Sequence, residues 1–270
     1  MDLAFGPVRF AARFDPGLGP ELPERLRAAC RPPDVVLYRP WPRYLLRELS
    51  VVPGSVAAGS GDPAYLDAPS GLRFRARGLE ARFGDAAVQV TLDPALRPRE
   101  MTDQLHLVLA AAASSAMARE ELGVVLHAST SAQEGRAWTF PAPHATGKST
   151  VARLLGVEKR LSDDLTALVT HPGEGVLAGG TNANTGGALS LAALLFLRRG
   201  PATCPGPRLG PGEALRAAVA NTVLFPGSPR LAEKVMGLLA DLVAAVPCHV
   251  LDFALHDLHP DRFRSLSWTT

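Results

Sequence analysis

Residues 137–155 read AWTFPAPHATGKSTVARLL: a short apolar run, a loop containing one glycine, and a run with helical spacing. The apolar residues 137–140 predict a buried strand, and Lys148–Leu155 predicts a helix with one apolar face. The loop between them carries Gly147, Lys148 and Ser149 in direct succession. A strand that passes through such a loop into a helix is a building unit of α/β proteins.

The loop at 142–150 satisfies a relaxed Walker A pattern, in which Ala142 replaces the first glycine. Gly147 lets the backbone approach phosphate oxygens closely, and the N–H groups at the start of the following helix attract an anion. In such a loop Lys148 reaches the β- and γ-phosphates, and the Ser149 hydroxyl ligates Mg²⁺. We therefore predict that ATP and Mg²⁺ bind here, on Ala142, Pro143, His144, Ala145, Thr146, Gly147, Lys148, Ser149 and Thr150.

The composition bounds the class of protein. The chain has 270 residues, a formal net charge of +2 and no long basic run, so binding to nucleic acid or to a membrane surface is not expected. The longest apolar run, 105–117, is too short to cross a bilayer core of about 30 Å. An acidic residue near the N-terminus and three widely spaced cysteines, Cys30, Cys204 and Cys248, favour a cytoplasmic protein without disulfides or zinc.

Residues 1–100 are predicted to be mainly β, with one early helix over 21–29. A strand is expected over 34–38. The alternation of 72–83, followed by a turn at Gly84-Asp85 and an apolar run over 87–92, predicts hairpins. The arginines at 73, 75 and 77 form a basic face, and we interpret them as the solvated side of a half-buried strand.

The second part of the chain alternates between strands and helices. Thr102 or Asp103 is the expected N-cap of an Ala-rich helix that ends near residue 121. Strands are predicted over 124–126, 137–140, 165–170, 176–178, 189–197 and 248–255, and helices over 148–155, 211–224 and 229–246. This pattern predicts an α/β core, with 1–100 as a mainly β region and 101–270 as the ATP-binding domain.

Two polar features accompany the loop. Asp163 and Asp164 follow the predicted loop helix, where the chain returns toward the loop, and adjacent carboxylates on extended backbone point to opposite sides. One can face a metal and the other an acceptor hydroxyl, as phosphoryl transfer requires. His127 lies at the end of the preceding strand. The pairing of that strand carries it either toward the phosphates or away from them, and the alternative role is a hydrogen-bonded core histidine.

These motifs, in this order, resemble the catalytic domain of bacterial HPr kinase/phosphorylase, whose fold is related to ATP-dependent phosphoenolpyruvate carboxykinase. The matching pieces are Leu126-His127-Ala128, Gly147-Lys148-Ser149 and Ser162-Asp163-Asp164. The resemblance is closer to HPr-kinase-related proteins that carry Leu-His-Ala-Ser, Gly-Lys-Ser-Thr and Leu-Ser-Asp-Asp-Leu, and it covers about residues 105–265.

The resemblance implies an α/β fold with a P-loop kinase core. By it, Lys148 stabilises the transferring phosphate, Ser149 and Asp163 ligate Mg²⁺, Asp164 is the general base and His127 belongs to the active site. Some features depart from the family. The family's metal-binding glutamate motif is not evident in 176–188, and residues 1–100 do not resemble the regulatory domain. HPr is therefore not the expected acceptor.

The leading hypothesis is a kinase that transfers the γ-phosphate of ATP to a hydroxyl, on a peptide, a protein or a small molecule. The alternative is a nucleotide-sensing or peptide-binding module with impaired catalysis. Carboxykinase-like chemistry on a small acid is a third and weaker hypothesis. HPr-kinase-like domains often assemble through their helices, so a homo-oligomer is compatible with the resemblance.

Overall fold

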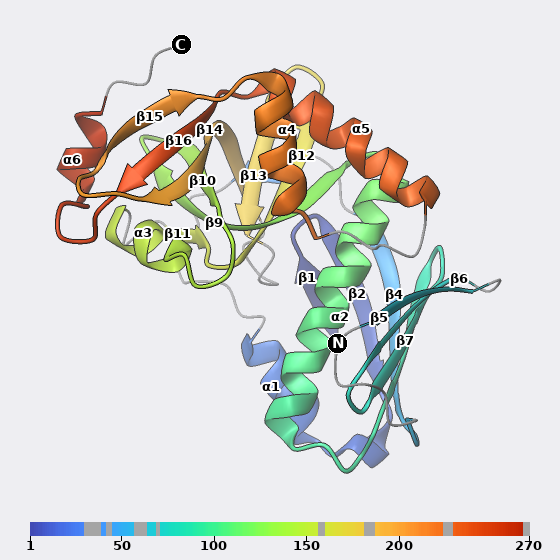
Figure 1. Cartoon of the computed structure of the whole chain (residues 1–270). Helices are drawn as coiled ribbons and strands as arrows, with labels where there is room; N and C mark the ends of the chain where they lie inside the picture. The colour runs from blue at the N-terminus through green and yellow to red at the C-terminus, as the bar shows by residue number, and fades with distance from the viewer. Residues whose placement is uncertain are drawn as a thin grey trace.

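The computed structural model describes residues 1–29, 39–41, 45–56, 64–68, 71–155, 160–180, 187–223 and 229–266. Within these ranges the protein is mixed α/β, with two mixed sheets and six α-helices. One sheet is built from strands of the first third of the chain, and the other from strands after residue 122 together with the short strand at Arg39–Pro40 (Figure 1). No helix in the described ranges has the length and apolar character needed to span a membrane.

The N-terminal sheet has seven strands in the order β1-β2-β4-β8-β7-β6-β5. β2, β4 and β8 run parallel, and the other neighbours are antiparallel. The strands are β1 (Asp2–Phe5), β2 (Val8–Phe14), β4 (Leu45–Pro53), β5 (Ala64–Ala68), β6 (Gly71–Ala76), β7 (Leu79–Phe83) and β8 (Ala87–Leu92). A 3₁₀ turn, η1 (Pro16–Leu18), and the helix α1 (Glu21–Ala29) follow β2.

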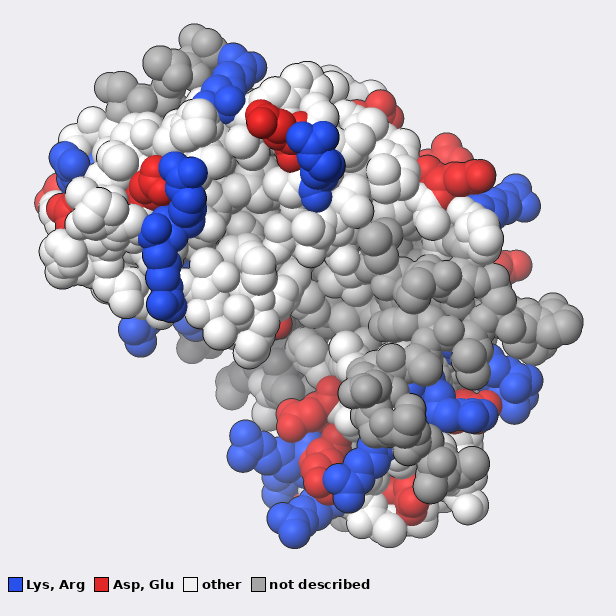
Figure 2. Space-filling view, in the orientation of Figure 1, with Lys and Arg blue, Asp and Glu red and all other residues white. Residues whose placement is uncertain are grey.

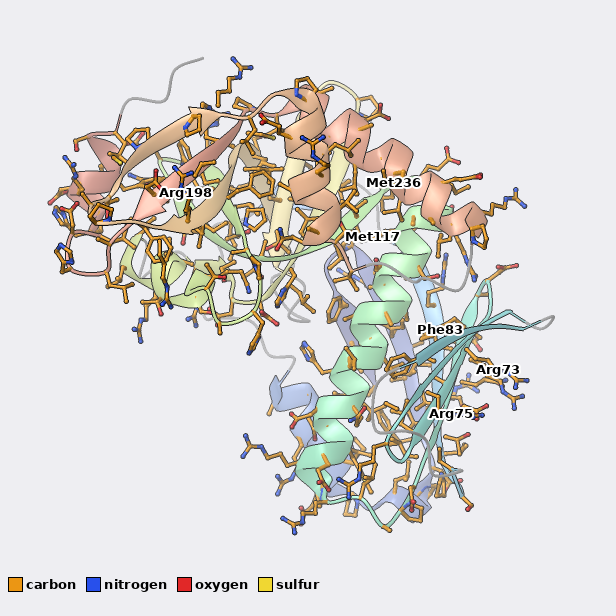
Figure 3. The ribbon with its side chains drawn as sticks, in the orientation of Figure 1. Arg73, Arg75, Phe83, Met117, Arg198 and Met236 are labelled. Atoms are coloured by element: carbon orange, nitrogen blue, oxygen red, sulfur yellow. The ribbon has the colours of Figure 1, made fainter. Side chains whose placement is uncertain are left out.

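One face of this sheet is apolar and the other faces water, because side chains alternate along each strand. In β2, Val8, Phe10 and Ala12 are buried while the residues between them are exposed. Phe83 of β7 is also buried on the side of α2, whereas Arg73 and Arg75 lie on the opposite, solvent-facing side (Figure 3). The predicted hairpin is confirmed by the antiparallel pairing of β7 with β8. Arg73 and Arg75 are half-buried, and Arg77 is exposed at the turn after β6.

Helix α2 (Pro98–Arg119) connects the two sheets, and it contacts β1, β2 and β7 of the first sheet as well as β9 and α5 of the second. The predicted N-cap at Thr102 or Asp103 is wrong. The helix begins at Pro98, because proline fits the first helical position and the Glu100 side chain accepts a hydrogen bond from the Arg97 backbone N–H. Thr102 instead hydrogen-bonds back to the Pro98 carbonyl.

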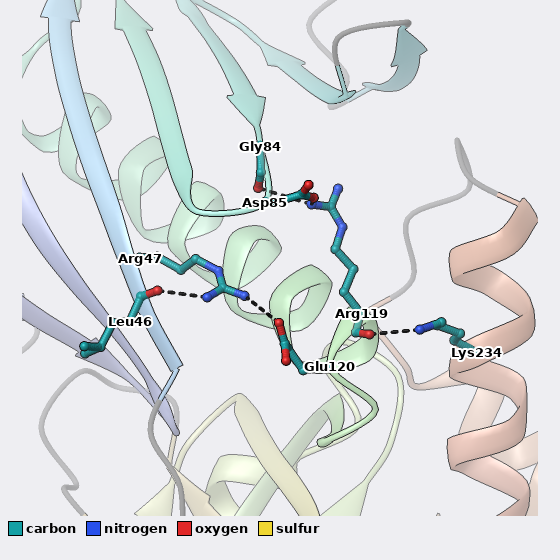
Figure 4. Close-up of polar contacts among 7 residues, drawn as sticks. All are labelled: Leu46, Arg47, Gly84, Asp85, Arg119, Glu120 and Lys234. Atoms are coloured by element: carbon teal, nitrogen blue, oxygen red, sulfur yellow. Dashed lines mark hydrogen bonds and ion pairs between the residues drawn. The ribbon is translucent and has the colours of Figure 1, made fainter.

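Residues 119–121, at and just after the end of α2, connect the N-terminal sheet region to α5, and Figure 4 shows the contacts of Arg119 and Glu120. Arg119 pairs with Asp85 at 2.9 Å and Glu120 pairs with Arg47 at 3.4 Å, and both partners lie in the N-terminal sheet region. Glu121 pairs at 2.8 Å with Lys234 of α5 (Pro229–Ala245), and Lys234 also donates to the Arg119 carbonyl.

The second sheet has nine strands, with the main order β10-β9-β12-β13-β14-β16-β15, and with β11 and β3 paired beside this path. The strands are β3 (Arg39–Pro40), β9 (Gly123–Gln133), β10 (Arg136–Pro141), β11 (Arg160–Ser162), β12 (Leu165–His171), β13 (Gly175–Gly180), β14 (Gly187–Arg199), β15 (Cys204–Arg208) and β16 (Cys248–Phe253). The helices of this half are α3 (Lys148–Leu155), α4 (Pro211–Ala220), α5 and α6 (Pro260–Arg264).

The two longest strands, β9 and β14, each take part in two sets of pairings. Their first set runs through β12 and β13, and their second runs through β10, which pairs antiparallel with β9 and parallel with β14. The closed set of pairings leaves the central strands buried on both faces, as the burial of β14 from Leu191 to Phe196 illustrates. The polar side chains of this half are therefore concentrated where the strands end.

Most predicted elements of the second half are confirmed, including α3 with its predicted bounds. The predicted helix over 211–224 is shorter, because α4 ends at Ala220 and Thr222 then forms a bridge with Leu126. Cys30, the predicted strand over 34–38 and residues 181–186 of the glycine- and asparagine-rich stretch lie outside the described residues. The division of the chain at residue 100 stays a prediction.

Candidate functional site

The hairpin of β9 and β10 places His127 beside the loop at 142–147. Its turn residues Glu134 and Gly135 have φ values of 51° and 73°, as a two-residue type I′ turn requires. The turn fixes the register, in which Pro141 faces Ala128. β10 runs into the loop, and its last residue pairs with Ala128, so His127 lies one residue past the loop end of the hairpin, which decides between the two alternatives left by the sequence. His127 does not end its strand, as the sequence suggested, but lies in the middle of β9, which continues to Gln133.

The Asp163-Asp164 bend lies at the same end of the sheet, between β11 and β12, which both pair with β9. The Ala128 N–H donates to the Asp164 carbonyl at 2.9 Å, and this backbone bond brings Asp164 next to His127. Three segments that are separate in sequence, namely the middle of β9, the loop after β10 and the bend before β12, therefore meet at one place.

The Asp164 carboxylate is the centre of the site. His127 Nε2 lies 2.7 Å from Asp164 Oδ1, and Lys148 Nζ lies 4.0 Å from the same oxygen. The hydrogen bond from His127 is the main cause that lowers the pKa of Asp164 below its usual value, and Lys148 and His144 act in the same direction. Asp164 is thus held ionised while its side chain stays 61% exposed and accessible.

Lys148, the first residue of α3, is buried although it is charged, with its side chain 5% exposed. Its Nζ donates to the Pro143 carbonyl at 3.0 Å across the loop. Burial lowers the pKa of Lys148, and the nearby Asp164 carboxylate offsets part of that effect. A buried lysine with so few partners destabilises the fold, and such groups are concentrated at functional sites.

Asp163 takes different partners from Asp164, as expected for adjacent residues that point to opposite sides. Its carboxylate lies 2.8 Å from Arg160, and burial raises its pKa above the usual value. Its carbonyl oxygen accepts hydrogen bonds from the hydroxyls of Ser149, at 3.0 Å, and Ser129. The Ser149 hydroxyl is therefore fixed between the start of α3 and the bend.

A buried threonine network below the site was not predicted from the sequence. The Thr130 hydroxyl lies 2.9 Å from that of Thr139 and 2.8 Å from that of Thr166, and Thr166 donates to the Ala128 carbonyl. The network joins β9, β10 and β12 directly beneath the loop. The register of the hairpin was the available signal, since the turn at 134–135 makes Thr130 and Thr139 face each other.

The carboxyl ends of three parallel strands, β10, β14 and β16, meet at the loop. Phe253 at the end of β16 lies under Gly147. The φ of Gly147 is 111°, a conformation that other residues adopt only at a considerable free-energy cost. Arg199 at the end of β14 donates to the carbonyls of Ala145 and Thr146. No local pattern indicated Arg199, because the pairing of β10 with β14 joins segments about fifty residues apart.

The remaining predicted residues line the same loop. The His144 ring is stacked on that of His127, with the planes inclined by 3° and the centroids 6.4 Å apart. Ala142 is buried, and Ala145 has a positive φ of 60°. All the predicted site residues therefore lie in one region, on the loop, at the start of α3, at the bend or in the middle of β9.

The donor set at the loop is suited to an anion with an associated hard cation. Lys148, the helix N-terminus of α3 and the glycine at 147 match the requirements of a phosphate group. The described residues form no cluster of three or more His, Cys, Asp and Glu side chains that would enclose a metal by itself. One hydroxyl and one or two carboxylates are nevertheless the protein ligands that Mg²⁺ uses when phosphate and water complete its shell.

Comparison with known proteins gave no relative: neither a protein-family model nor a curated protein matches the chain.

Proposed function

We propose that this protein is a Mg²⁺/ATP-dependent phosphotransferase that moves the γ-phosphate of ATP to a hydroxyl of a peptide, a protein or a small molecule. One observation carries the proposal. An ionised, accessible carboxylate, Asp164, lies 4.0 Å from the lysine of a Walker A-like loop and accepts a hydrogen bond from His127. A carboxylate in this position can accept the proton of an acceptor hydroxyl, which phosphoryl transfer requires.

The loop would bind the phosphates of ATP. Lys148 would leave the Pro143 carbonyl and pair with phosphate oxygens, and the N–H groups at the start of α3 would face the same anion. Ser149 and one of the two aspartates would hold Mg²⁺, which when bound neutralises charge on the phosphates. The exchange of a carbonyl for a phosphate partner would also relieve the unfavourable burial of the Lys148 ammonium.

Asp164 would position the acceptor hydroxyl and take its proton. The acceptor oxygen would form a bond to the γ-phosphorus as the bond from phosphorus to the β–γ bridging oxygen breaks, with ADP leaving. A carboxylate of lowered pKa is a weak base, but phosphoryl transfer passes through a loose transition state in which positioning contributes most. His127 would hold the carboxylate in place through its N–H.

The fold proposed for this half of the chain is a P-loop kinase core of the HPr kinase/phosphoenolpyruvate carboxykinase type. The support is the resemblance of the three motifs and their convergence at the carboxyl ends of β10, β14 and β16. We further propose a cytoplasmic location, in which Cys204 and Cys248 stay as the free thiols seen here.

The Asp164→Asn substitution tests the proposal. Phosphate transfer from γ-labelled ATP to a panel of hydroxyl peptides and small alcohols is measured together with ADP release, which also reports water as the acceptor. Loss of a general base is expected to lower the rate by about 100-fold or more, while the dissociation constant of ATP changes little. Transfer at the wild-type rate would exclude Asp164 as the base.

The same experiment distinguishes the nucleotide-sensing alternative. Saturable ATP binding by the wild-type protein, with no ADP release under any acceptor, would favour a sensor over a kinase. Absence of ATP binding would contradict both functions.

A further inference from the structure

We propose that Arg199 is a positioning residue of the nucleotide loop, which holds the outer side of the loop so that its inner side is ready to bind phosphate. The inference rests on the proposed function, because it concerns how the loop binds its nucleotide. Arg199 is the last residue of β14, the strand that runs parallel to β10 and ends beside the loop.

The contacts of Arg199 lie on one side of the loop. Its Nε donates to the Thr146 carbonyl at 3.4 Å, and its Nη2 donates to the Ala145 carbonyl at 3.3 Å. In a planar trans peptide the C=O of one residue is opposite to the N–H of the next. Carbonyls turned toward Arg199 therefore turn the N–H groups of Thr146 and Gly147 to the other side.

That other side is the interior of the loop. The Thr146 N–H donates to the Pro143 carbonyl at 3.4 Å, and Lys148 Nζ donates to the same oxygen at 3.0 Å. Two of the donors that would serve a phosphate are thus oriented toward a common point. Arg199 acts on the outside of this arrangement and Lys148 on the inside.

The backbone of this loop needs such support. Ala145 has a φ of 60°, a left-handed conformation that is strained for an alanine. Pro143 has no N–H to contribute to hydrogen bonding. Two long hydrogen bonds from one guanidinium group offset part of the strain at Ala145 and leave fewer alternative conformations for the loop.

Arg198 provides a natural contrast one residue away (Figure 3). Its guanidinium forms two bonds to the Asp252 carboxylate, at 2.6 and 2.8 Å, so its charge is compensated within the sheet. Arg199 pairs with no acid among the described residues, and its bonds go to neutral carbonyls. Its positive charge therefore adds to the potential at the loop, which favours an anion.

The test measures binding of MgADP, which needs no acceptor, by isothermal titration calorimetry. Arg199→Ala is expected to raise the dissociation constant about tenfold, as the loss of two weak hydrogen bonds and a nearby charge implies. Arg199→Lys keeps the charge and one donor group and should recover part of the affinity. The melting temperature of both variants should stay close to that of the wild type, since Arg199 is exposed.

Arg198→Ala is the matched control, which removes the Asp252 ion pair and should leave the affinity for MgADP unchanged. Equal affinity of the wild type and Arg199→Ala would overturn the inference, as would an equal loss of affinity in both alanine variants. No MgADP binding by the wild-type protein would instead overturn the proposed function, and with it the premise of this inference.

Discussion

The solvent-facing side of the N-terminal sheet and the loop end of the second sheet both carry charged side chains, but in different surroundings. In the first, Glu80 pairs with Arg75 at 3.0 Å and with Arg82 at 3.5 Å on a face exposed to water. In the second, Lys148 is buried and Asp164 accepts its main hydrogen bond from a histidine. On the face of the whole molecule that Figure 2 draws, positive and negative side chains are interspersed.

The charged side chains of the first region stabilise the folded state, whereas Lys148 and Asp163 of the second region lower its stability. Arg75 lowers the pKa of Glu80, so ionised Glu80 is favoured by folding. Burial raises the pKa of Asp163 and lowers the pKa of Lys148, so the charged forms of both are disfavoured by folding. Charged groups that destabilise the folded state and lie together at strand ends are the expected signature of a functional site.

The largest expected effect comes from removing the buried cation of the second region, Lys148. Lys148→Met should weaken ATP binding by about 100-fold or more, because the loop loses its only buried cation at the described site. Its melting temperature should be equal to or above that of the wild type, since a buried charge is removed. Binding and melting are measured on the same samples.

Arg73→Met is the matched control in the N-terminal sheet, and both its ATP affinity and its melting temperature should stay near wild type. A lower affinity in this variant would show that the two regions are coupled. Unchanged affinity in Lys148→Met would remove the basis for the nucleotide loop.

Two glycines that lie close to carbonyl oxygens allow the tightness of backbone packing in the two regions to be compared. A Cβ at Gly123, in β9, would lie 2.0 Å from the Leu168 carbonyl oxygen, a contact that β9 and β12 cannot accommodate without moving apart. Gly123→Ala should therefore lower the free energy of unfolding by about 3 kcal/mol or more, as overpacking of a core does at its upper range. Denaturant unfolding measures the change.

The corresponding change in the N-terminal region is Gly84→Ala, where the Cβ would lie 3.3 Å from the Ala87 carbonyl oxygen at an exposed turn. We expect a loss of less than about 1 kcal/mol there. Equal losses in the two variants would contradict the tighter backbone packing of the second sheet.

The smallest expected effects concern the pH dependence of stability and differ in sign. Glu80 has a lowered pKa in the folded state, so its stabilisation is present above its unfolded pKa and is lost as the pH falls through the folded pKa. Asp163 has a raised pKa, so its ionised form destabilises the fold above its folded pKa, and this effect disappears below its unfolded pKa.

At neutral pH, Glu80→Gln should thus lower the free energy of unfolding and Asp163→Asn should raise it, each by about 0.5 kcal/mol or less because the pairs are partly exposed. The two variants should become indistinguishable from wild type in strong acid. Urea unfolding as a function of pH measures both changes, and a loss of stability in Asp163→Asn at neutral pH would contradict the assignment of its carboxylate as a destabilising group.

Several features of the fold could be predicted because their causes are local. The helix α3 has the predicted bounds, since its apolar spacing and the preceding glycine lie within one short segment. The N-cap of α2 was placed five or six residues too late, because Thr102 has the side chain of a cap whereas the proline at 98 and Glu100 form the actual helix start. Local competition between two signals explains this error.

The sequence indicated the residues of the candidate site, but it indicated their spatial arrangement only in part. The hairpin turn at 134–135 contained enough information to place His127 at the loop, because a two-residue turn fixes the register of both strands. The different partners of the two aspartates and the contact of Arg199 with the loop depend on pairings between distant segments, which no local pattern encodes.

The sequence by itself determined the strand–loop–helix segment over 137–155, since a strand, a glycine-containing turn and a helix start require only neighbouring residues. The tertiary structure decided which groups surround that loop. It turned Asp164 toward Lys148 and His127, and Asp163 toward Arg160, and it brought Arg199 to the outer side of the loop. The physical reason is that strand pairing brings together residues that are far apart in the chain, and their side chains interact only after the sheet has formed.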